Sequence, residues 1–157
     1  EWVATVSALL ALASLVLNWF VVRRQTQLQF EELKAQMDSD VLAWAHEAID
    51  LVSQGVALAR GRGAIYQPDE FRRLAHETSQ KLSSSADRGR LFFPNEAPEE
   101  HGQDREGAFQ GFRPPILDAV VFTCSQVEKM VPDEAGPDKA AADFMIKCRR
   151  LLVSEMR

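Results

Sequence analysis

The hydrophobic pattern of the first part of the chain predicts one long helix that is apolar at its start and amphipathic afterwards. Residues 2–22 carry no charged side chain, and neither glycine nor proline occurs before Gly55. A helix over residues 2–22 rises about 31 Å, which matches the hydrocarbon core of a bilayer. We therefore expect residues 1–24 to form a transmembrane helix that continues without a break until Gly61 and Gly63 end it.

Beyond this segment, apolar side chains recur at steps of three and four residues, as in helices that bury one face. In the first helix these are Phe30, Leu33, Met37, Val41, Trp44, Ala48, Val52 and Val56. Three shorter helices are expected to follow. The first is expected to bury Phe71, Leu74, Thr78 and Leu82, and the second Ile116, Val120, Cys124, Val127 and Val131. The third is expected to bury Ala141, Phe144, Cys148 and Leu151. Each is expected to begin at a proline, because the first helical turn tolerates a missing N–H. These starts are Pro68, Pro114-Pro115 and Pro137-Asp138.

The predicted fold is all-α, with the transmembrane helix 1–24 continuing into a cytosolic four-helix bundle over residues 25–157. The stretch "SSSADRGRLFFPN" is expected to break the second helix, with Phe92 and Phe93 anchored in the bundle. A long charged loop near 94–115, rich in glycine, proline and acidic residues, is expected before the third helix.

The residues at the ends of the apolar segment predict its orientation. Trp2 stands at one end and Trp19-Phe20 at the other, where interfacial aromatic residues are expected. Arg23 and Arg24 follow directly, so the positive-inside rule places the C-terminal domain in the cytoplasm. A cleaved signal peptide would carry its positive charge before the apolar run, which favours an uncleaved single-pass anchor.

One face of the apolar segment carries small and polar residues in place of large apolar ones. It consists of Ala4, Ser7, Ala11, Ser14 and Asn18 and continues as Val22, Gln25, Gln29 and Glu32, and we call it the polar face. Lipid tails are as apolar as leucine, so helices associate in a bilayer through small residues and shared polar contacts. The polar face therefore predicts a homo-oligomer in the lipid bilayer, with a pore as the narrower prediction, because uncharged polar groups suit a water-filled lumen. The alternative is a simple anchor whose serines bond to carbonyls of their own helix.

Composition adds little chemistry to this prediction. The formal net charge of −5 argues against general coating of nucleic acid. Cys124 and Cys148 lie in apolar helical patterns, so we expect reduced thiols in a cytosolic core. The sequence lacks clustered metal ligands, a phosphate-binding glycine loop and a nucleophile motif, so no catalytic residue, metal site or cofactor is predicted. For His46 and His76 we expect structural hydrogen bonds.

Arginines supply the main candidates for a binding site. Arg72 and His76 lie on the second helix, and Arg88 and Arg90 flank Gly89. Guanidinium groups bind phosphates through paired hydrogen bonds, so these residues could recognise RNA, a nucleotide or a partner protein. The alternative function is therefore a membrane-tethered binding module. Solvated helix faces and ion pairs with the acidic residues would also account for the arginines.

"DRGRLFFPN", the charged loop and "GFRPPILDAVV" resemble the small single-pass membrane accessory proteins of type VI-B CRISPR systems and related uncharacterised bacterial membrane proteins. The resemblance implies a HEPN-like cytosolic domain and a ring-shaped pore in the bacterial inner membrane. It also implies an RNA-guided Cas effector as partner in antiphage defence. HEPN ribonucleases use an arginine followed at a longer spacing by a histidine, whereas Arg72 and His76 have only three residues between them. We therefore expect no enzymatic activity, and the alternative is a degenerate ribonuclease that uses Arg72 and His76.

Overall fold

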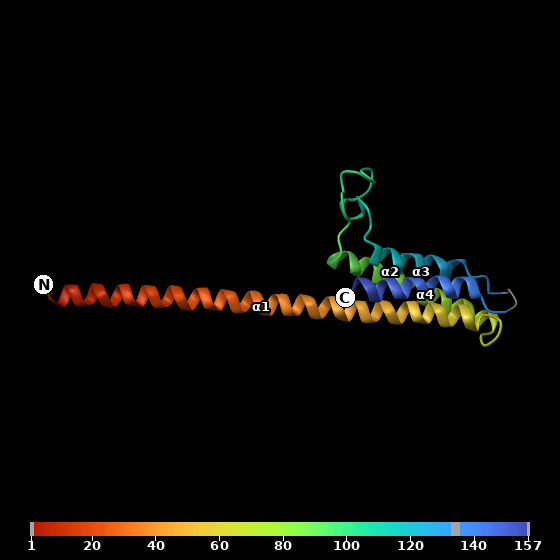
Figure 1. Cartoon of the computed structure of the whole chain (residues 1–157), viewed down its shortest axis with the longest axis horizontal. Coiled ribbons are helices and arrows are strands. Elements are labelled where there is room, and N and C mark those ends of the chain that lie inside the picture. Colours follow the sequence, from red (N-terminus) through yellow and green to blue (C-terminus); the bar gives the residue numbers. More distant parts are fainter. Residues whose placement is uncertain (1, 133–135, 157) are drawn as a thin grey trace. The chain divides into compact units, whose positions relative to one another are not determined.

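The computed structural model describes residues 2–132 and 136–156, with side chains described for residues 14–132 and 136–156. It contains the helices α1 (Trp2–Gly61), α2 (Pro68–Phe92), α3 (Pro115–Lys129) and α4 (Lys139–Glu155), and a 3-10 turn, η1 (Gly107–Phe109) (Figure 1). The predicted all-α fold is confirmed for this part of the chain. The chain divides into two compact units, residues 1–40 and residues 41–157.

The first unit consists of helix α1 up to Asp40. Every side chain described in this unit, from Ser14 onward, is exposed. Within the part of the chain that the structure describes, no helix holds an apolar stretch long enough to cross a bilayer. The expected transmembrane segment, residues 1–24, begins with residues 1–13, whose side chains lie outside the described part. The predicted unbroken helix is confirmed, because α1 holds 60 residues and ends at Gly61.

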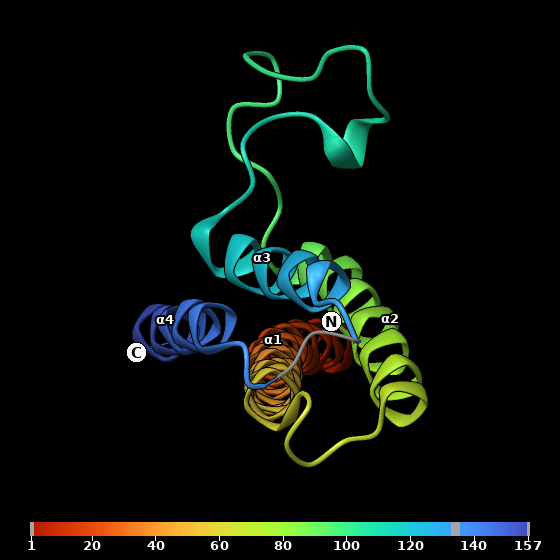
Figure 2. The ribbon, with the colours of Figure 1, turned by 90° about the vertical axis from the view of Figure 1, so that its right-hand side faces the viewer.

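The second unit is a bundle of the remaining part of α1 with α2, α3 and α4. Helix α3 packs against both α2 and α4 (Figure 2). The core draws apolar side chains from all four helices, and the largest fully buried ones are Phe71, Leu82, Leu117, Met145 and Leu152. Burying one such side chain contributes about 1.5–3 kcal/mol relative to leaving it in water. This apolar core is therefore the main force that holds the bundle together.

The end of α2 differs from the prediction that "SSSADRGRLFFPN" breaks the helix, which is wrong because α2 continues to Phe92. Small residues leave room on the inner side of α2, and Trp44 of α1 lies against them. The Trp44 indole nitrogen donates a hydrogen bond of 2.8 Å to the carbonyl oxygen of Ser85, and Gly89 faces the same ring. The ring centroids of Phe92 and Phe93 lie 6.5 and 5.4 Å from that of Trp44, so their predicted anchoring is confirmed.

Six positions that the helical period predicts to be buried are exposed. Phe30, Leu33 and Met37 belong to the first unit, which consists of α1 alone, and Val131, Phe144 and Leu151 belong to the second. Helix α3 ends before Val131, so the period no longer applies there, and Met130 is buried instead. In α4 the buried face is offset by one residue from the predicted positions, so Met145 and Leu152 are buried in place of Phe144 and Leu151. The other positions predicted to face inward in α3 and α4 are buried.

Asp138 fixes the start of α4, as the sequence predicts. Its side chain accepts a hydrogen bond of 2.9 Å from the Ala141 backbone N–H, which is the role of an N-cap. Its own backbone N–H donates to the carbonyl oxygen of Ala59 at 2.8 Å, which ties α4 to the end of α1. The carboxylate also pairs with the buried Arg62, at 3.5 Å.

Both cysteines lie in the core, and they form no disulfide. Cys124 belongs to α3 and Cys148 to α4. Burial raises the pKa of the Cys124 thiol to about 11 and also raises the pKa of Cys148. Their predicted core positions are confirmed, and their thiols are poor nucleophiles near neutral pH.

Candidate functional site

The residues predicted to line a pore or an oligomer interface all belong to the first unit. Ala4, Ser7 and Ala11 lie outside the described side chains. The others, all exposed, are Ser14, Asn18, Val22, Gln25, Gln29 and Glu32. At 100° per residue these six fall within an arc of about 80°, so they share one face of the helix.

Apolar side chains flank the polar face on both sides. The first flank consists of Phe30, Leu33 and Met37, and the second flank consists of Leu17, Leu28 and Ala35. Helical geometry puts each flank about a quarter turn from the polar face, in opposite directions. The five large side chains of the two flanks are all more than half exposed. The first unit by itself therefore leaves both flanks uncovered.

Between Ser14 and Arg23 the exposed surface is apolar on almost every side of the helix. It is formed by Leu15, Val16, Leu17, Trp19, Phe20, Val21 and Val22. The rings of Trp19 and Phe20 meet edge to face, with centroids 5.1 Å apart. The Arg23 guanidinium carbon lies 5.2 Å from the centre of the Trp19 ring, which is a cation–π contact. Aromatic residues beside arginine are typical of the membrane–water interface.

The structure places the predicted set Arg72, His76, Arg88 and Arg90 at two separate sites on α2. Arg72 pairs with Asp69 at 3.2 Å, and His76 is exposed one turn further on. Arg88, about 24 Å along the helix from Arg72, pairs with Glu47 of α1. Only Arg90, at the end of α2, lies in a pocket with other cationic groups.

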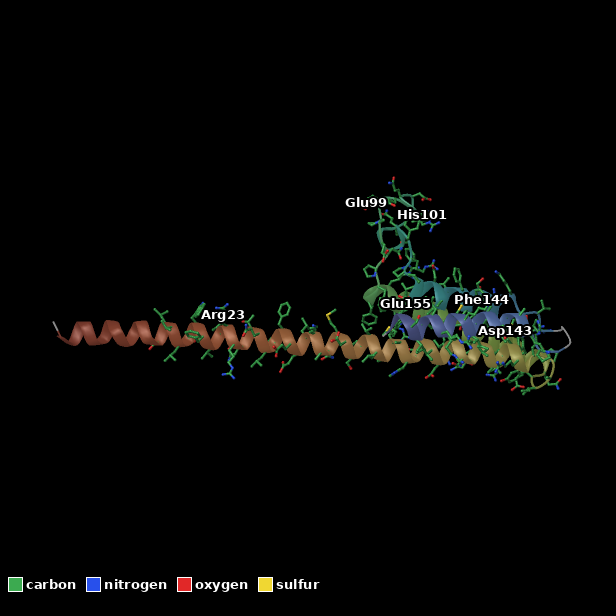
Figure 3. All side chains as sticks on the ribbon, in the orientation of Figure 1. Arg23, Glu99, His101, Asp143, Phe144 and Glu155 are labelled. Carbon is green, nitrogen blue, oxygen red and sulfur yellow. The ribbon has the colours of Figure 1, made fainter. Side chains whose placement is uncertain are left out.

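The segment between α2 and α3 forms the predicted long loop on one side of the bundle (Figure 1). Its two arms are joined by an antiparallel bridge in which Glu96 and Phe112 exchange backbone hydrogen bonds of 2.8 and 2.7 Å. Gly111 has a φ of 83°, and a Cβ at this position would press on the carbonyl oxygen of Glu96. Its N–H donates to the carbonyl oxygen of His101 at 2.7 Å. His101 itself lies in the part of the loop that extends away from the helices (Figure 3).

Between this loop and the ends of α2 and α3 lies a cavity of about 220 Å³, which we call the loop pocket. Its lining includes Arg90, Arg105, Arg113 and Asp118, which are charged, and His101, Asn95, Phe109, Gly111 and Phe112 complete the wall. Three arginines therefore face a single carboxylate. Among these lining residues the chemistry is that of hydrogen-bond donors and cations, without a nucleophile beside a base.

The arginines of the loop pocket are held in place by aromatic and acidic neighbours. The Arg90 guanidinium carbon lies 4.6 Å from the centre of the Phe109 ring, and its Nε lies 3.7 Å from Asp87. Arg113 donates from Nη1 to Asp118 at 3.1 Å. Such contacts fix the guanidinium planes and leave other N–H groups of each fork available.

Sequence reasoning found Arg90 but missed Asn95, His101, Arg105 and Arg113 as its neighbours. The four lie within or beside an acidic loop, and their composition alone indicates only a solvated segment. The available signal was the pair of arginines at the two ends of that loop, beside "FFPN" and "GFRPP".

No protein-family model matches the chain, and the searches of curated proteins and of solved structures return no significant match. The resemblance to CRISPR accessory proteins therefore stays a prediction.

Proposed function

We propose that the protein is a membrane-anchored homo-oligomer that forms a pore in, or depolarises, the membrane that holds it. The observation that carries this proposal is the uncovered apolar surface of residues 14–22, which ends at Arg23. Its antiphage role, its site in the bacterial inner membrane and its RNA-guided partner rest only on the resemblance.

The free energy of hydration supports the membrane anchor. Each large apolar side chain left in water forgoes about 1.5–3 kcal/mol of burial, and residues 14–22 expose seven of them. A surface that is apolar on almost all sides of one helix suits lipid better than a single protein partner. Arg23 stacked on Trp19 then suits the headgroup region, where the guanidinium charge stays hydrated.

The two flanks support self-association in a closed ring. In a ring of parallel helices each copy contacts one neighbour on each side, so the two contact surfaces of a copy differ. The first flank of one copy would pack on the second flank of the next. The polar face, midway between the flanks, would then point toward the centre, where uncharged polar groups can be solvated. A simple anchor requires neither flank.

Dye release from liposomes that contain the full-length chain tests this function. Leu33→Asn removes the centre of the first flank, and Asp38→Asn introduces the same side chain on the opposite side from the polar face. Losing one buried leucine at each contact should weaken the contact by about 10- to 100-fold. We expect release by the wild type and by Asp38→Asn, and little release by Leu33→Asn. Intact liposomes with the wild type, or equal release by all three chains, would refute the proposal.

The second candidate function is a membrane-tethered binding module, and the loop pocket is the observation that favours it. Arg90 is the one residue of the predicted arginine set that lines this pocket. The two functions are compatible, because the pocket belongs to the bundle and the flanks belong to the first unit.

A further inference from the structure

The loop pocket holds buried polar atoms that the rest of the described chain leaves unsatisfied. The Nε–H groups of Arg90 and Arg113 have no hydrogen-bond acceptor among the described residues, and the Oδ1 of Asn95 has no donor. The Asn95 amide is oriented by its Nδ2, which donates to the carbonyl oxygen of Gln110 at 2.8 Å. An unsatisfied buried group destabilises the protein, and does so more strongly when it is charged. The three residues that carry these atoms all line the loop pocket, so a ligand that supplies both acceptors and a donor suits this place.

The charge of the lining selects an anion as that partner. Arg90, Arg105 and Arg113 outnumber the two carboxylates that engage them, which are Asp87, 3.7 Å from the Nε of Arg90, and Asp118, which accepts from Nη1 of Arg113. The remaining acidic residues of the loop, Glu96, Glu99, Glu100, Asp104 and Glu106, are exposed and do not line the pocket. Guanidinium forks bind phosphate oxygens with better geometry than isolated ammonium groups do.

We propose that the loop pocket binds a phosphomonoester of a small hydroxyl-bearing molecule, with its phosphate oxygens accepting from Arg90 and Arg113. A phosphate supplies the acceptors that the two Nε–H groups need, and a neighbouring hydroxyl supplies a donor to Asn95. Arg105, which is exposed on the loop, adds charge from the outer side of the pocket. A volume of about 220 Å³ accommodates a phosphate with a sugar-sized group.

The backbone bridge of the loop keeps the two arms of the loop, and therefore Arg90 and Arg113, close together. Arg90 comes from the end of α2 and Arg113 from the residues before α3, and the bridge between Glu96 and Phe112 closes the loop between them. Gly111 permits this bridge because its backbone has a φ of 83°, in the region that favours glycine. Gly111→Ala should therefore open the pocket while every arginine stays in the chain.

Isothermal titration of the full-length chain in detergent, in phosphate-free buffer, tests the proposal with AMP and with inorganic phosphate as probes. One charge-assisted hydrogen bond is worth about 1.5–3 kcal/mol, so Arg90→Gln and Arg113→Gln should each weaken AMP binding by about 10- to 100-fold. Arg105→Gln, on the exposed part of the loop, should weaken it less. Arg73→Gln removes an exposed arginine elsewhere on α2 and should leave AMP binding unchanged.

Two further measurements distinguish a free phosphate ligand from a lipid headgroup and show whether each variant is folded. Vesicles with and without phosphatidic acid show whether a lipid headgroup competes with AMP for the same arginines. Circular dichroism of each variant shows whether the bundle is intact, and Gly111→Ala should lose AMP binding without loss of helix. The absence of binding by AMP, inorganic phosphate and phosphatidic acid would overturn the proposal, as would binding unaffected by Arg90→Gln and Arg113→Gln. Either result leaves dye release by the first unit unaffected, so failure here is distinct from failure of the proposed function.

Discussion

Gly89 lies inside α2, where helix propensity alone favours alanine by about 1 kcal/mol. The structure predicts the opposite result for Gly89→Ala. A Cβ at this position would lie 2.6 Å from Cζ2 of Trp44 and would also press on Cδ2 of Leu117. Both neighbours are buried, and the indole ring is rigid.

The expected magnitude follows from two opposed terms. Overpacking a well-filled core costs about 1–3 kcal/mol, and the propensity gain offsets about 1 kcal/mol of that cost. We therefore expect Gly89→Ala to lower the free energy of unfolding by up to about 2 kcal/mol. At Gly55, another helical glycine, the closest atom is Sδ of Met145 at 2.9 Å. A flexible thioether can move aside, so Gly55→Ala should be closer to neutral.

Urea unfolding of the full-length chain at fixed detergent concentration, followed by far-ultraviolet circular dichroism, measures these differences as shifts of the midpoint. Gly107→Ala is a matched control, because a Cβ at Gly107 would meet nothing within 4 Å. Gly89→Ala with a stability about 1 kcal/mol above that of the wild type, the gain expected from helix propensity alone, would refute the packing of Trp44 against α2.

The other predictions concern single contacts of the bundle. Trp44→Phe removes the hydrogen bond to Ser85 and should destabilise the chain by about 1 kcal/mol or more in the same urea assay. Asp138→Ala removes the α4 cap and the carboxylate that pairs with buried Arg62, so it should lower the unfolding free energy by about 1–3 kcal/mol, and Asp138→Asn by less. Burial raises the pKa of Cys124 to about 11. Iodoacetamide should therefore label native Cys124 at pH 8 at least about a hundredfold more slowly than a solvated thiol, and faster only as the pH rises. Equal rates would contradict its burial.

Local chemistry made the helix starts predictable from the sequence. Pro68 begins α2, Pro115 begins α3 and Asp138 caps α4, because proline and aspartate act within a single turn. The inner faces of the helices were mostly predictable as well. The errors in α4 arose because three- and four-residue spacing fixes a helical face only to within about one residue.

Contacts between distant segments made the rest unpredictable. Helix α2 continues through "DRGRLF" because Trp44 of α1 packs against it at Ser85 and Gly89, and Trp44 is distant from both in the sequence. The loop pocket depends on the bridge that brings Arg90 and Arg113 to one cavity. The Trp44 contact leaves no periodic or local signal in the chain, and the loop pocket leaves only the two arginines at the ends of the loop.

Cysteine cross-linking in membranes tests the central claim, a ring of identical helices, most directly. Leu33→Cys lies in the first flank and Ala35→Cys in the second, and the native thiols Cys124 and Cys148 are buried. Mild oxidation of the full-length chain carrying both substitutions should give a ladder of covalent multimers, whereas either substitution alone should give monomers. Monomers from the doubly substituted chain, or dimers from Leu33→Cys alone, would contradict a ring in which the two flanks meet.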